Sequence, residues 1–158
     1  MKKENRFLKG NDHQLDSMIK KKLTASQIID TMISKDEFSQ WLGISRVEER
    51  EGYCKLRMEI RPEMCNGFGI AHGGIAYSFA DSALAFASNS HGRHAVSIET
   101  SITHLKALHS SEIITATSEE QSFGNRTAVY YIKVENDEGL IALFKGTVFI
   151  KDSEWIAE

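Results

Sequence analysis

The segment from Gly73 to Ser88 is the feature that most limits how this chain can fold. It has the length of a helix and carries apolar residues on nearly every side, with almost no polar face. A helix that is apolar all round is buried on all sides, so other parts of the chain have to enclose it. Its many alanines let neighbouring strands approach closely. We therefore predict one buried helix around which the domain is built.

The enclosing structure is predicted to be a β-sheet. Apolar and charged residues alternate from Cys54 to Arg61, which indicates a half-buried strand, and Glu51-Gly52 predicts a hairpin turn from an earlier strand near residues 44–49. Four later segments are rich in β-branched and aromatic residues: Val96–Leu105, Ile113–Ser122, Ala128–Glu135 and Leu140–Ile150. The short connections between the last three favour an antiparallel meander. Six antiparallel strands wrapped around one helix give an α+β fold, and an open sheet edge would pair with another subunit.

The residues before the sheet divide into a basic arm and a helix. Residues 1–22 hold seven basic and three acidic side chains. We predict that residues 1–23 form a flexible basic arm and that residues 24–158 form a single domain. Apolar residues recur at helical spacing after Thr24 or Ser26, either of which can cap the helix. The apolar face is predicted to continue through Phe38, Trp41 and Leu42, and Gly43 is placed to end the helix.

Composition excludes several classes of function. The chain has 158 residues, 41% of them hydrophobic and 26% charged, as is typical of one globular domain. A net charge of −3 gives no overall basic field, so we expect no nucleic-acid partner. The absence of an apolar run of about 20 residues predicts no membrane span. The polar N-terminus lacks a secretory signal and two cysteines cannot form a disulfide framework, so we expect a cytoplasmic protein.

Asp81 is the residue in the apolar helix that requires explanation. It lies between Phe79-Ala80 and Ala83-Leu84, where an unpaired buried carboxylate costs several kcal/mol, roughly. Two structural interpretations are open: the Asp81 side chain faces solvent, or it is held by hydrogen bonds within the protein. The third is a partly desolvated carboxylate of raised basicity, which can serve as a general base or nucleophile.

The same helix is predicted to begin at His72-Gly73-Gly74. Amide groups at a helix N-terminus have no intrahelical acceptor, so they can polarise a carbonyl and hold a developing oxyanion, although a tight turn explains the glycines equally well. Gly73 and Asp81 are about 12 Å apart along one helix, whereas a base acts within about 3 Å of its proton. If both act on one substrate, the site is built across a homodimer.

Other reaction classes have weaker signals. Four histidines in the later half of the chain, His91, His94, His104 and His109, match no familiar zinc spacing. No Gly-x-Ser-x-Gly elbow and no glycine-rich phosphate loop occurs. We therefore expect no metal and no cofactor, because a carboxylate can transfer protons and a helix N-terminus can stabilise charge.

Two motifs in this region resemble a known family. Asn66–Gly74 (NGFGIAHGG) followed by Ser78–Ala83 (SFADSA) is similar to the hot-dog-fold thioesterases of the phenylacetate-degradation PaaI type. The similarity runs from about Ile28 to Asp152 and includes Trp41–Ile44 and Ala142–Gly146. The resemblance implies a hot-dog fold, a dimer or dimer of dimers, and hydrolysis of acyl-CoA thioesters.

The resemblance also implies roles for individual residues. Asp81 would be the catalytic base or nucleophile, and the Gly73 amide, with Gly74 beside it, would bind the thioester carbonyl. His72 and Asn66 would order the loop and position the reacting groups. Ser97 would assist the carboxylate and its water, although Glu99, Thr100 or Ser101 could take that role after a small register shift.

Three basic residues are candidates to bind the phosphates of coenzyme A: Lys106, Arg126 and Lys145. For each of them a solvated surface charge is the alternative. Two positions depart from the family pattern, because Phe68 replaces a histidine found in some relatives and Ala107 replaces a proline. Two other functions stay open, a hot-dog hydratase or dehydratase and a non-catalytic module that binds or senses acyl-CoA.

Overall fold

The structure is a computed structural model that describes residues 21–157, so most of the predicted basic arm lies outside the described residues. The helical elements are α2 (Ala25–Lys35), α3 (Glu37–Leu42), the short 3-10 turn η1 (Pro62–Met64) and α4 (Gly73–Asn89). The strands are β1 (Ser45–Arg50), β2 (Tyr53–Glu59), β3 (Arg93–His104), β4 (Ile113–Phe123), β5 (Thr127–Asn136) and β6 (Gly139–Glu154). No helix in this part of the chain is long and apolar enough to span a membrane.

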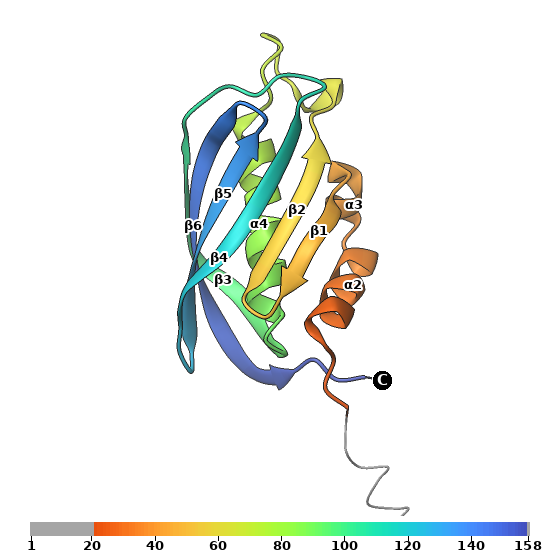
Figure 1. The fold of residues 1–158 in the computed structure, drawn as a ribbon, viewed down its shortest axis with the longest axis vertical. Helices are drawn as coiled ribbons and strands as arrows, with labels where there is room; N and C mark the ends of the chain where they lie inside the picture. The colour runs from red at the N-terminus through yellow and green to blue at the C-terminus, as the bar shows by residue number, and fades with distance from the viewer. Residues whose placement is uncertain (1–20, 158) are drawn as a thin grey trace, which may run out of the picture.

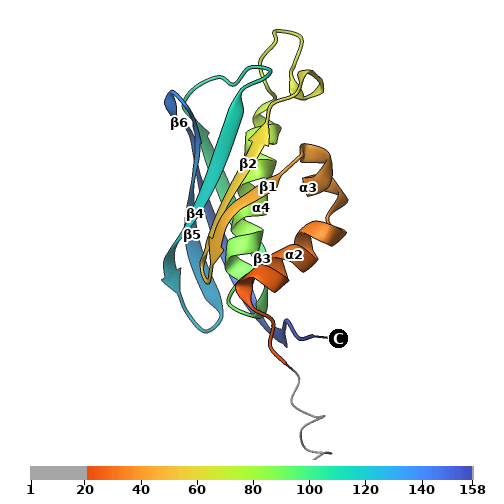
Figure 2. The ribbon, with the colours of Figure 1, turned by 45° about the vertical axis from the view of Figure 1, so that its right-hand side comes forward.

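All six strands belong to one antiparallel sheet with the order β1-β2-β4-β5-β6-β3. The sheet curves around α4, and α2 and α3 lie on the other side of that helix (Figures 1 and 2). This is the predicted α+β arrangement, and the predicted meander is the run β4-β5-β6. Residues 21–23 run beside the C-terminal segment, where Lys22 pairs with Ile156 and the Lys22 ammonium contacts Glu154 at 2.8 Å.

The predicted first helix is two helices. Thr24 caps α2 through a capping box with Gln27, but α2 ends at Asp36, whose carboxylate accepts hydrogen bonds from the amides of Phe38 and Ser39 and starts α3. The new axis changes which side chains face the core. Phe38 and Trp41 are therefore 51% and 48% exposed and stack on each other, contrary to the prediction. Gly43 ends α3 in the left-handed conformation, as predicted.

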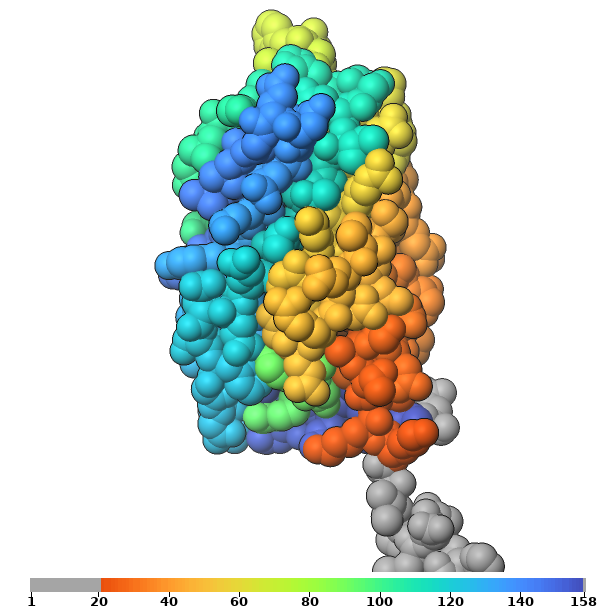
Figure 3. All heavy atoms as spheres, viewed as in Figure 1, coloured from red at the N-terminus to blue at the C-terminus, as the bar shows by residue number. Residues whose placement is uncertain are grey.

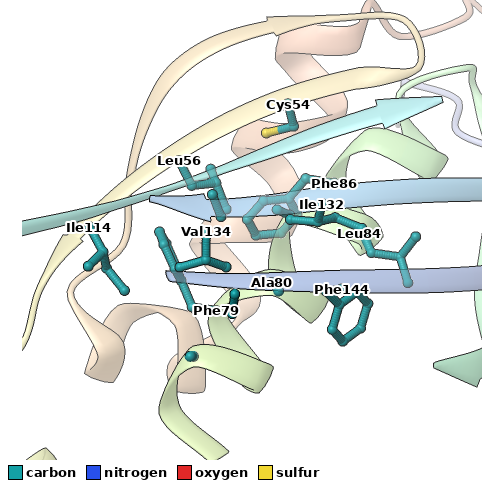
Figure 4. Close-up of a cluster of buried hydrophobic side chains, with 14 of the residues drawn as sticks. Cys54, Leu56, Phe79, Ala80, Leu84, Phe86, Ile114, Ile132, Val134 and Phe144 are labelled. Atoms are coloured by element: carbon teal, nitrogen blue, oxygen red, sulfur yellow. The ribbon is translucent and has the colours of Figure 1, made fainter. Parts of the chain in front are cut away.

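The core lies between α4 and the concave face of the sheet. Cys54, Leu56 and Met58 of β2 point into it, as their alternation predicts. Figure 4 shows side chains from α4 meeting those of the strands in one cluster. The β6 strand approaches α4 closely at Gly146, because a methyl group there would lie 2.3 Å from Cδ2 of Leu84. A glycine in the sheet therefore sets how near α4 can pack.

The strand at one edge of the sheet, β3, lies under α4 with its other side unpaired. Its pairing with β6 shifts between Ser97 and Glu99, and the residue between them, Ile98, is 58% exposed. On either side of this bulge Ser97 and Thr100 face α4, because they pair with the inward-facing Val148 and Gly146 of β6. The bulge thus keeps polar side chains of β3 beneath the helix.

Candidate active site

Asp81 occupies the middle of α4 and faces a cavity of about 250 Å³. Its side chain is half-buried, and burial raises the pKa of its carboxyl above the usual range. Within residues 21–157 the carboxylate has no ion pair or hydrogen-bond partner to offset the lost hydration. An underhydrated carboxylate of this kind is more basic than one in water, so the arrangement suits proton abstraction or nucleophilic attack.

Ser97 lines the same cavity as Asp81, together with Leu84, Val96 and Val148. The register alternatives are placed elsewhere. Glu99 lies on the outer face of the sheet, where it contacts Thr147 and Lys145. Thr100 points toward α4, but its hydroxyl pairs with that of Tyr77. Ser101 lines a different cavity. Of the four polar candidates, the structure therefore brings only Ser97 to the cavity of Asp81.

The N-terminus of α4 lines a second cavity, of about 390 Å³, at the end of the helix. His72 precedes the helix without a side-chain capping bond, so its imidazole does not occupy the amides of the first turn. Gly73 lies against the ring of His104, whereas a methyl group on Gly74 would meet nothing within 4 Å. The first turn of α4 is thus open to this cavity at Gly73, whereas Gly74 does not line it.

Asn66 shapes the loop that leads into α4. Its Oδ1 accepts hydrogen bonds from the amides of Phe68 (2.9 Å) and Ile70 (3.2 Å), and its own amide donates to the Ile70 carbonyl. The loop protrudes at the top of the molecule (Figure 3), and Phe68 within it is 90% exposed. The amide of His72 then donates to the Met64 carbonyl at 3.0 Å. The side-chain oxygen of Asn66 is therefore engaged in fixing the entry to the helix.

Gly73 and Asp81 belong to different cavities of one chain. They stand at the beginning and the middle of the continuous helix α4, and eight residues at about 1.5 Å each separate them by about 12 Å. Asp81 faces Ser97 on β3, and Gly73 faces His104 at the end of the same strand. Neither of these two cavities holds both groups.

The three candidate phosphate ligands lie in different places. Lys106 lines the cavity at Gly73, and its ammonium donates to the Glu138 carbonyl at 3.3 Å. Arg126 pairs with Asp152 at 2.8 Å, in the turn between β4 and β5, at the end of the molecule opposite the loop before α4 (Figure 1). Lys145 lies on the outer face of the sheet. The structure brings only Lys106 of the three to either cavity described above.

The histidines weighed as metal ligands are dispersed, and no group of three or more His, Cys, Asp or Glu side chains in the described part of the chain could hold a metal ion. His91 pairs with Glu120, His94 stacks on Trp155, and His109 meets the Gly69 carbonyl. His104 lines the cavity at Gly73, but from sequence it was weighed only as a metal ligand. The inward face of β3 could have indicated its place in the site, but the bulge after Ser97 interrupts the alternation of that strand.

Several known proteins are similar to this chain in sequence and in fold. The sequence profile described as "Thioesterase superfamily" matches residues 68–142. A protein of Archaeoglobus fulgidus is 42% identical over 84% of this chain and 87% of its own length. The acyl-coenzyme A thioesterase PaaI of Escherichia coli K12 is 34% identical over 77% of this chain and 88% of its own. The solved structure of E. coli PaaI superposes with a TM-score of 0.81 at 32% identity, covering 83% of this chain and 96% of that one.

The six-stranded antiparallel sheet around a long central helix is therefore a hot-dog fold, as predicted. Both cavities are lined by the same helix, α4. Its glycine-rich N-terminus borders one cavity, and its half-buried aspartate borders the other. The chain belongs to the thioesterase superfamily and is a PaaI-like thioesterase.

Proposed function

We propose that this protein hydrolyses acyl-CoA thioesters to a free acid and coenzyme A. The observation that carries the proposal is Asp81, a half-buried carboxylate that has no partner among residues 21–157 and shares its cavity with Ser97. Relatedness to an acyl-coenzyme A thioesterase supports the substrate class. Both cysteines are free thiols, which fits a cytoplasmic location.

The proposed reaction needs only groups of this chain and water. The Gly73 amide donates a hydrogen bond to the thioester carbonyl oxygen and stabilises the negative charge that develops there. Asp81 either removes a proton from the water that attacks the carbonyl carbon, or attacks that carbon itself to give an anhydride that water then opens. The carbon–sulfur bond breaks in both routes, and the thiolate of coenzyme A leaves and takes up a proton. Ser97 holds the attacking water beside the carboxylate.

We further propose that each site is shared between two copies of the chain. The unpaired edge of β3, with the exposed Val96 and Ile98, supports association through this strand. Antiparallel pairing of two such edges about a two-fold axis sets the two α4 helices side by side in opposite directions. Gly73 of one copy then faces Asp81 of the other, which resolves the separation of about 12 Å within one copy.

The test is release of free thiol from a panel of acyl-CoAs, followed for the wild-type protein and for Asp81→Asn. Asp137→Asn, a change at an exposed residue of the turn between β5 and β6, is the matched control. Turnover that is lost in Asp81→Asn and retained in Asp137→Asn supports hydrolysis at this site. Tight binding of acyl-CoA without thiol release would replace the proposal by a binding or sensing module.

Mixed oligomers test the sharing of sites. Gly73→Pro removes the amide proton at a position where proline is compatible with a helix start, and Asp81→Asn removes the carboxylate. A heterodimer of the two inactive variants has one site with both defects and one with neither. Activity should therefore return to at most half of the wild-type value. Sites contained in single subunits would regain nothing.

A further inference from the structure

The imidazole of His104 lies directly against the residue proposed to bind the thioester carbonyl. His104 is the last residue of β3, and this strand runs beneath α4 in the opposite direction. Ser97 of β3 shares a cavity with Asp81, Thr100 pairs with Tyr77, and His104 meets Gly73. The end of the strand is thus fixed at the beginning of the helix by a series of contacts along both elements.

The contact between His104 and Gly73 is close. A methyl group on Gly73 would lie 3.1 Å from Nε2 of His104 and 3.4 Å from Cε1, so the far end of the ring points at the glycine. Both residues line the cavity at the N-terminus of α4. Because glycine has no side chain, the ring nitrogen and the Gly73 amide can approach the same small volume. The Gly73 amide and Nε2 of His104 therefore border the same part of this cavity.

The ring nitrogens of His104 are also free to bind a ligand. His91, His94 and His109 each place a ring nitrogen against a protein acceptor, namely Glu120, the Ser153 carbonyl and the Gly69 carbonyl. Within residues 21–157 neither nitrogen of His104 has such a partner. A polar atom that faces a cavity without a protein partner is available to a bound molecule.

We propose that His104 is a second hydrogen-bond donor to the thioester carbonyl, beside the Gly73 amide. This inference rests on the proposed hydrolysis of acyl-CoA and adds a catalytic residue to it. In the tautomer that carries its proton on Nε2, the imidazole donates to the carbonyl oxygen of the substrate. The bond strengthens as negative charge develops on that oxygen, so His104 lowers the barrier more than it improves substrate binding.

The first test compares the steady-state kinetics of His104→Phe, His104→Gln and His94→Phe. Phenylalanine keeps the ring and its packing but has no donor, and we expect kcat to fall about a hundredfold and KM to rise by at most about tenfold. Glutamine restores an N–H at about the position of Nε2 and should return kcat to within about tenfold of wild type. His94→Phe, which preserves the stacking on Trp155 away from the site, should leave both constants unchanged.

The second test measures binding of two unreactive coenzyme A derivatives by calorimetry. One is a ketone, in which a methylene group replaces the thioester sulfur and the carbonyl is kept, and the other is a thioether without a carbonyl. His104→Phe should weaken binding of the ketone about tenfold and leave binding of the thioether unchanged, because one hydrogen bond to the carbonyl is lost.

Several results would overturn the inference. One is an unchanged kcat in His104→Phe. Another is an equal loss of kcat in His104→Phe and His104→Gln. A third is equal weakening of the binding of the ketone and of the thioether, which would mean that the ring only shapes the cavity. Turnover that is lost in Asp81→Asn but kept in His104→Phe rejects the role of His104 alone. A wild-type protein that releases no thiol, or an Asp81→Asn variant that is fully active, rejects the proposed function and with it the reaction in which His104 would act.

Discussion

The distance between α4 and the sheet depends on Gly146, and replacing this residue by alanine tests that dependence. Gly146 is buried on β6 opposite Leu84 of α4, and its backbone is not in the left-handed region. Alanine is therefore compatible with the backbone, and only the added methyl group is in question. That group would lie 2.3 Å from Cδ2, 3.0 Å from Cδ1 and 3.2 Å from Cγ of Leu84, whereas carbon atoms in contact are about 3.5–4.0 Å apart.

Two opposing effects set the expected magnitude for Gly146→Ala. Loss of glycine restricts the unfolded chain and stabilises the folded state by about 0.4–1 kcal/mol. Overpacking of a core costs about 1–3 kcal/mol, and here the clash involves three side-chain atoms of Leu84. We expect the free energy of unfolding to fall by about 1–2 kcal/mol. Because Asp81 lies one turn before Leu84 on α4, a displaced helix should also lower kcat.

A double-mutant cycle with Leu84→Ala identifies the cause. Leu84→Ala alone leaves a cavity and should cost about 2–5 kcal/mol, but in the double variant the methyl group at position 146 occupies part of that space. The double variant should therefore be more stable than the sum of the single effects predicts, by about 1–3 kcal/mol. Urea unfolding at one fixed protein concentration measures all four proteins. A neutral Gly146→Ala variant, or strictly additive effects, would refute the argument.

Three further predictions concern single side chains. Asp81→Asn should lower kcat by about 10²–10⁴-fold. Burial raises the pKa of Asp81 in the folded state, so the wild type loses stability as pH rises through that pKa. At pH 7, Asp81→Asn should therefore unfold at a higher urea concentration than the wild type. This difference should close below the pKa of the unfolded state, which is about 4. Ser118→Ala removes a buried hydroxyl that has no hydrogen-bond partner in the described part of the chain and should stabilise the protein by about 1 kcal/mol in urea unfolding. Thr24→Ala removes the cap of α2 and should cost about 1 kcal/mol.

Each of these changes has a control or an outcome that contradicts it. An Asp81→Asn variant less stable than wild type at pH 7 would mean that the carboxylate is favourably bound in the folded protein. A less stable Ser118→Ala would show that the hydroxyl does have a partner. Thr24→Ser, which keeps the hydroxyl of the capping box, should unfold near the wild-type midpoint.

Features that depend on neighbouring residues could be predicted from the sequence. The apolar composition of residues 73–88 indicated the central helix, the alternation after Cys54 indicated β2, and Gly43 ends α3 as expected. The break between α2 and α3 at Asp36 was not predicted, although an aspartate is a common helix cap. The apolar periodicity continues past Asp36 and indicated one uninterrupted helix. The spacing of Gly73 and Asp81 also implied their separation, since a helix has a fixed rise per residue.

The sequence by itself therefore determined the elements, the α+β class and the position of the carboxylate on the helix, because these follow from the conformational preferences and hydrophobic pattern of adjacent residues. The tertiary structure decided which distant residues meet. Ser97 faces Asp81 only because the bulge in β3 shifts its register, His104 contacts Gly73 because β3 runs under α4, and Gly146 meets Leu84 because β6 lies beneath it. Such contacts depend on strand order and packing between separate segments, for which a single sequence carries no periodic signal.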